Sequence, residues 1–132
     1  MEEKIMSMKQ WIPVTGLAVL ALLSVNSAIA HGSAKPMYGG IVQMANDLTF
    51  ELVADNDGAT IYLMDHGKPM SAKGITGKLT ILQGSKKTDA EVKEAGDNKL
   101  RAAGVKLAKG DKLVAVLANV AGKSTTVRFT VK

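Results

Sequence analysis

The chain has 132 residues, a length that fits one domain. Its 46% apolar residues exclude a disordered chain, and its 22% charged residues exclude a chain that is buried in a membrane throughout. The net charge of +5 comes from lysines that are spread along the sequence without aromatic residues between them, so it does not predict nucleic-acid binding. Because the chain has no cysteine, an exported form would depend on its core alone for stability.

The N-terminal region has the pattern of a secretory signal. Residues 12–25 are apolar or small and carry no charge, a run too short to span a membrane but long enough for the apolar region of a signal peptide. The sequence Ala28-Ile29-Ala30 supplies a small-x-small cleavage site. We therefore expect residues 1–30 to be a cleaved signal peptide and the mature protein to be periplasmic, without stable membrane insertion. Translation from Met8 would give a more basic start than Met1, so both starts remain open.

After the signal, residues 31–39 are rich in small residues and read as an extended lead-in, and residues 40–132 read as a single β-domain. Turn signals rich in Gly, Asp and Asn separate the strand-like segments, and Asp57-Gly58 predicts a type I′ turn. The segment 113–118 is wholly apolar and predicts a central strand that is buried on both faces. The predicted strands are 48–52, 59–64, 78–83, 90–93, 98–102, 113–118 and 126–131. This spacing predicts an all-β fold, an immunoglobulin-like β-sandwich of about seven strands.

Two motifs that resemble ligand sites are better explained as turns. Gly122-Lys123-Ser124-Thr125 resembles the end of a phosphate-binding loop, but Leu117 stands where that loop needs its first glycine, and a strand follows. The segment 55–58 resembles the start of a calcium loop, but the required glycine and glutamate are replaced by Thr60 and His66. No serine or threonine lies in a recognisable nucleophile motif with a base. We therefore expect the protein not to be an enzyme.

The remaining group of chemically active residues predicts a metal site. Cleavage after Ala30 would give His31 a free α-amine beside its imidazole, a chelate suited to Cu(II). The second histidine, His66, lies among a carboxylate and thioethers, and thioethers prefer Cu(I). Exposure in a turn is the plain alternative for His66, and core packing is the plain alternative for the methionines. The candidate copper ligands are His31, His66, Asp65, Met70, Met37 and Met64, with Met44 as a further sulfur near the lead-in.

Several short segments resemble a group of small exported proteobacterial proteins that are encoded among copper or cobalt–zinc–cadmium efflux components. A related pattern occurs in the extra β-domain of some metal-efflux adaptor proteins. The group often opens with His-Gly-Gly, whereas this chain has Tyr38-Gly39-Gly40, so one candidate ligand of the group is missing. His31 and His66 do match. The resemblance rests on residues 39–42, 50–53, 65–69, 77–80, 95–100 and 127–129, which span nearly the whole mature chain.

The resemblance and the ligand set together lead us to expect a periplasmic protein that binds or buffers copper and delivers it to a metal-efflux component. His31 and His66 would supply nitrogen ligands, and Asp65 would be a weak ligand or orient the His66 imidazole. The thioether of Met37, Met64 or Met70 would take over when copper is reduced. Two other functions stay open. One is a metal-free interaction domain that docks on an envelope partner through a strand edge or a lysine-rich face. The other is an accessory module of an enzyme with a pocket for a small ligand.

Overall fold

The structure, a computed structural model, describes residues 34–132. The predicted signal peptide, its cleavage site and His31 lie outside the described residues. Within residues 34–132 the regular secondary structure consists of β-strands alone, which confirms the all-β prediction. Within the same stretch, no helix has the length and apolar character that a membrane crossing requires.

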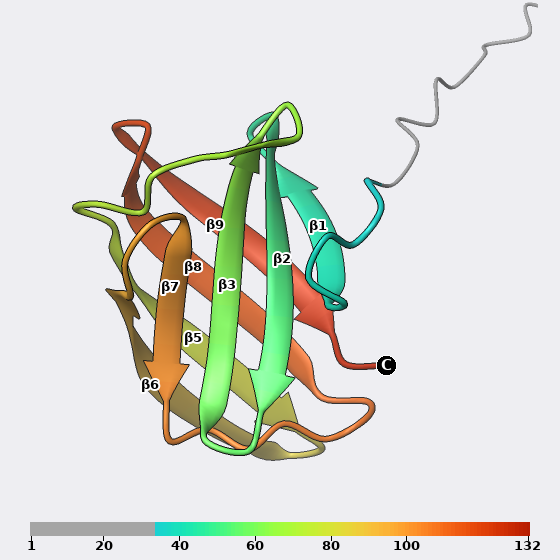
Figure 1. Cartoon of the computed structure of the whole chain (residues 1–132). Coiled ribbons are helices and arrows are strands. Elements are labelled where there is room, and N and C mark those ends of the chain that lie inside the picture. The colour runs from blue at the N-terminus through green and yellow to red at the C-terminus, as the bar shows by residue number, and fades with distance from the viewer. Residues whose placement is uncertain (1–33) are drawn as a thin grey trace, which may run out of the picture.

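The strands include every segment that the sequence predicted and two more, β1 and the two-residue β4 (Figure 1). The strand β1 is short and its burial pattern does not alternate cleanly, which is why its sequence did not stand out as a strand. The strands are β1 (Ile41–Ala45), β2 (Leu48–Asp55), β3 (Gly58–Asp65), β4 (Lys68–Pro69), β5 (Thr76–Gln83), β6 (Lys86–Glu94), β7 (Lys99–Ala103), β8 (Lys112–Val120) and β9 (Lys123–Thr130).

All strand pairings are antiparallel, and hydrogen bonds join the strands in the order β1-β2-β3-β7-β6-β5-β8-β9, with β4 paired to β3. The path curls until β1 lies against β9, so the sheet is nearly closed (Figure 1). One side-chain hydrogen bond crosses this seam, from Asn46 Nδ2 to Thr125 Oγ1 at 3.1 Å. The immunoglobulin-like sandwich, which needs two separate layers, stays a prediction.

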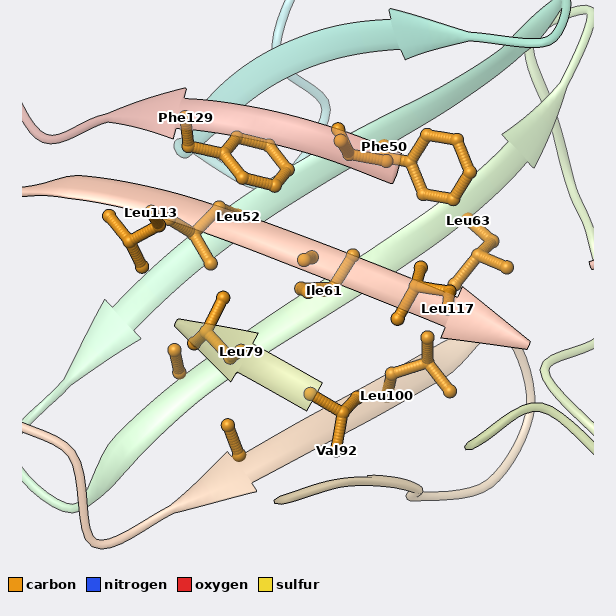
Figure 2. Packing of buried hydrophobic residues seen from close by; sticks show 14 of the residues in the cluster. Phe50, Leu52, Ile61, Leu63, Leu79, Val92, Leu100, Leu113, Leu117 and Phe129 are labelled. Atoms are coloured by element: carbon orange, nitrogen blue, oxygen red, sulfur yellow. The ribbon is translucent and has the colours of Figure 1, made fainter. Parts of the chain in front are cut away.

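The core lies inside the curled sheet and follows from alternation along the strands. Successive side chains of a strand point to opposite faces, so every second residue of β2, β3, β5, β8 and β9 enters the interior. Figure 2 shows these side chains meeting from strands that are distant in sequence. Each fully buried Leu, Ile or Phe contributes about 1.5–3 kcal/mol relative to an exposed one. The largest of these are Phe50, Leu52, Ile61, Leu63, Ile75, Leu79, Leu100, Leu113 and Leu117.

The prediction that 113–118 is buried on both faces is wrong. Leu113, Ala115 and Leu117 are buried, whereas Val116 is 41% exposed. The reason is that β8 belongs to an antiparallel sheet, one face of which can meet solvent. The apolar run therefore places Val114 and Val116 on the outer face of the sheet.

The turn prediction at 55–58 is also wrong in its type. A type I′ turn needs positive φ at both central residues, and neither Asn56 nor Asp57 has it. Instead, Asp55 Oδ1 accepts a hydrogen bond from Asp57 N at 2.8 Å, so a side chain closes this turn. Positive φ at both central positions occurs in the β3–β4 turn, at His66 (49°) and Gly67 (80°).

Candidate functional site

His66 is the first central residue of the β3–β4 turn, and its backbone has the left-handed conformation, with φ at 49°. Histidine adopts this conformation several times more often than most residues do, and Gly67 takes the second positive φ without a steric cost. The tight turn directs the His66 side chain away from the sheet, and 85% of it is exposed. The imidazole is therefore accessible from solvent.

The neighbouring carboxylate fixes which nitrogen of His66 is available. His66 Nδ1 lies 2.5 Å from Asp65 Oδ1. An ionised carboxylate only accepts hydrogen bonds, so in the neutral imidazole this contact places the hydrogen on Nδ1 and leaves the lone pair on Nε2. Carboxylates hold metal-binding imidazoles in this way in many proteins. Asp65, with a side chain that is itself 55% exposed, therefore contacts the imidazole, and its role toward a metal ion stays a prediction.

The predicted methionine ligands lie on two different faces of the sheet. Met64 is 2% exposed and follows the core residue Leu63, so it lies on the outer face. Met70 packs against the core, and its amide donates to Leu63 O at 3.0 Å. Met37 is 57% exposed. The structure therefore separates Met70 from Met64, although they are close in sequence.

The β3–β4 turn, which holds His66, and the β1–β2 turn lie at the same end of the sheet, and Ala34 lies beside β1. Ala45, Leu48, Asp65 and Lys68 lie in one row across β1 to β4, so the β1–β2 and β3–β4 turns both follow that row. An open hollow of about 470 Å³ runs along β1 and is lined by residues 42–47 together with Ala34. The described chain thus begins beside β1, three residues after His31 in sequence.

Sequence reasoning missed Glu51, which is fully buried on the outer face of β2. Two backbone amides of the lead-in and the amide of the residue that follows it donate to its carboxylate: Met37 N at 2.7 Å, Tyr38 N at 2.7 Å and Gly40 N at 2.9 Å. The Tyr38 ring also stacks on Tyr62, with ring centroids 3.7 Å apart. The lead-in is therefore fastened to the outer face of β2 and β3.

Gly40 allows the close approach between the chain and β2 that this arrangement needs. A Cβ at Gly40 would overlap the carbonyl oxygen of Leu52, so the lead-in can approach β2 only with glycine there. Glu51 itself occupies a polar position of an alternating strand, which predicts exposure. Its burial depends on a segment that has no periodic pattern of its own.

An ion pair with two hydrogen bonds lies away from His66, on β2 and β7. Arg101 donates from Nη1 to Asp55 Oδ2 at 2.8 Å and from Nη2 to Asp55 Oδ1 at 3.0 Å. These bonds, together with the Asp57 amide, lower the pKa of Asp55 from 3.8 to about 2. On β6, a hydrogen bond from Thr80 similarly lowers the pKa of Asp89. Both groups stabilise local strand contacts.

Between residues 34 and 132, no three histidine, aspartate or glutamate side chains lie together as a group that could hold a metal ion. Within that range, the Nε2 atom of His66 and the thioethers of Met37 and Met44 are exposed soft or borderline donors. Comparisons with protein-family models, with curated proteins and with solved structures find no match for this chain.

Proposed function

We propose that the mature chain is a periplasmic copper-binding protein that buffers the metal or delivers it to an efflux component. The observation that carries the proposal is the β3–β4 turn, where a carboxylate orients an exposed imidazole with its Nε2 atom free. The proposal includes export through the signal peptide of residues 1–30 and an immunoglobulin-like sandwich. In that sandwich β1–β4 and β7 would form one layer, and β5, β6, β8 and β9 the other, with the end of β6 also paired to β7.

In this proposal the terminal amine and imidazole of His31 bind Cu(II), and His66 completes the nitrogen set. Three residues of extended chain between Ala34 and His31 cover about 10 Å. The strands β1 and β3 are two strand spacings apart, which is also about 10 Å. A terminus that starts beside β1 is therefore within reach of the turn at the end of β3. No catalytic step is part of the proposal.

The experiment is a Cu(II) titration against a competing chelator, with mature protein that begins at His31. We expect at least a tenfold weaker affinity for His66→Ala, and a similar loss when one alanine precedes His31. Asp65→Asn should weaken binding by about tenfold, because the imidazole loses its orienting partner.

Lys68→Ala is the matched control, since Lys68 is an exposed residue of the same turn that does not bind Cu(II) in this proposal. It should bind Cu(II) like the unchanged protein. Equal affinity in His66→Ala and in the extended protein would overturn the proposed site.

A second candidate function, docking on an envelope protein, is favoured by the outer face of β8. Val114, Val116 and Leu82 form an apolar strip there, and Val116 and Leu82 are 41% and 37% exposed. Each is paired with a basic residue on the neighbouring strand: Val114 with Arg128, Val116 with Lys78, and Leu82 with Lys112. An apolar strip with a basic border fits a partner whose docking face is apolar with acidic residues around it.

The docking candidate is tested with the periplasmic domain of a metal-efflux adaptor from the same organism. We expect Lys112→Glu combined with Arg128→Glu to raise the dissociation constant at least tenfold. The pair Lys86→Glu and Lys123→Glu is the control for net charge, because these first residues of β6 and β9 do not lie opposite Val114, Val116 or Leu82 in the strand register. Equal loss in both pairs, or no loss in either, would contradict docking at this face.

A further inference from the structure

Three methionines share the outer face of the first half of the sheet. Ile41 and Ala45 pack against the core, so Met44 between them points outward, as Met64 does after Leu63. Met37 belongs to the lead-in that lies over the same face, where its amide donates to Glu51. The fourth described methionine, Met70, packs against the core instead.

The strand register brings two of these thioethers to one position. Met44 pairs with Thr49, and Thr49 pairs with Met64, so the three residues form one row across β1, β2 and β3. The outer strands of that row are about 10 Å apart. A methionine side chain has three rotatable bonds and covers about one strand spacing, so both sulfurs can lie above Thr49.

The third thioether is held close to this row by the lead-in. Glu51 lies two residues after Thr49 on the same face, about 7 Å along the strand. The 2.7 Å hydrogen bond from Met37 N to Glu51 Oε1 fixes the backbone of Met37 beside it.

Packing in the core does not explain why the Met37 and Met44 side chains are exposed. Met37 and Met44 are 57% and 49% exposed, the two highest values among the large apolar residues of 34–132, while Met64 beside them is 2% exposed. A half-exposed apolar side chain gains only part of the free energy that full burial provides. Thioethers without a thiolate or a water-like ligand are a donor set that selects Cu(I).

We propose that Met37, Met44 and Met64 form a thioether site for Cu(I) above Thr49, separate from the nitrogen ligands that take Cu(II). The proposal rests on the proposed copper function and adds Met44 to the ligands. In it the lead-in carries a ligand to the sheet, so fastening of residues 37–40 by Glu51 completes the site. Met70 has no part in it.

The test is a competition titration of the mature protein with Cu(I) and a chromogenic chelator without oxygen, repeated with Ag(I) as a redox-inert probe. Met37→Leu and Met44→Leu remove one sulfur each at nearly constant volume. We expect each to weaken Cu(I) binding at least tenfold. Met70→Leu makes the same chemical change on the core side and should leave Cu(I) affinity unchanged.

Each outcome decides the proposal. Unchanged affinity in Met44→Leu and Met37→Leu would overturn it, and so would an equal loss in Met70→Leu. The Cu(II) titration of His66→Ala separates the two sites. If His66→Ala keeps full Cu(II) affinity while the methionine variants lose Cu(I), the proposed nitrogen site fails and the thioether site stands. If His66→Ala loses only Cu(II), both sites stand.

Discussion

The two halves of the sheet differ in how their outer faces meet solvent. On β2 and β3 the outer residues Glu51 and Met64 are 0% and 2% exposed, whereas Val116 on β8 is 41% exposed. The inner faces of both halves are equally well buried. The difference is made by the lead-in, which covers one outer face and leaves the other open. Alternation along a strand thus predicts which residues point inward, but not whether the opposite face is covered.

The largest effect is expected from removing the carboxylate that holds the lead-in. Glu51→Ala leaves three amides without their acceptor in a partly buried place, and each such loss costs about 1–3 kcal/mol. Because water can reach part of the freed segment, we expect a total loss of about 3 kcal/mol in urea unfolding. Amide exchange at Met37, Tyr38 and Gly40 should accelerate.

Glu91→Ala is the control for this change, because Glu91 is exposed and only approaches Lys93 at 3.7 Å. It should change stability by less than about 0.5 kcal/mol. If Glu51→Ala is as mild as Glu91→Ala, the carboxylate does not hold the lead-in.

A smaller effect is expected from the aromatic stack that also fastens the lead-in. Tyr38→Ala removes the ring that stacks on Tyr62 and the hydroxyl that accepts from Asn98 Nδ2 at 3.3 Å. We expect a loss of about 1–2 kcal/mol in urea unfolding. Met37→Ala, a change at an exposed neighbour, should cost less than about 0.5 kcal/mol without metal. The same cost in both variants would show that the stack adds nothing.

The smallest effect is expected at the ion pair between Arg101 and Asp55. Residues 34–39 of the lead-in make no hydrogen bond to this pair, so it shows what a surface contact contributes where no segment covers the sheet. The pKa of Asp55 is about 2, below its ordinary 3.8, so the stabilisation is present above pH 4 and is lost as the pH falls towards 2. Arg101→Met should return the pKa of Asp55 towards 3.8, as followed by NMR. The stability difference from the unchanged protein should shrink over the same pH range. Lys93→Met, at a looser ion pair, is the control and should leave the pKa of Asp55 unchanged.

The strands were predictable from sequence because apolar and polar residues alternate along β2, β3, β5 and β9. The covering of Glu51 by the lead-in was not predictable from sequence. The lead-in residues show no alternation of apolar and polar side chains, and they bind Glu51 through their backbone amides. The pairing of Asp65 with His66 was predictable from their adjacency. The placement of Met64 and Met70 on opposite faces of the sheet was not predictable from sequence. The two-residue alternation along a strand cannot be continued through a turn such as His66-Gly67.

Pulsed EPR of the mature protein loaded with one equivalent of Cu(II) tests the central claim most directly. The N-terminus is first determined by mass spectrometry of the exported form. The account predicts a terminus at His31 and two inequivalent imidazole nitrogens on the copper, one of which disappears in His66→Ala. A mature chain that begins at another residue, or a spectrum that is the same in His66→Ala, would contradict it.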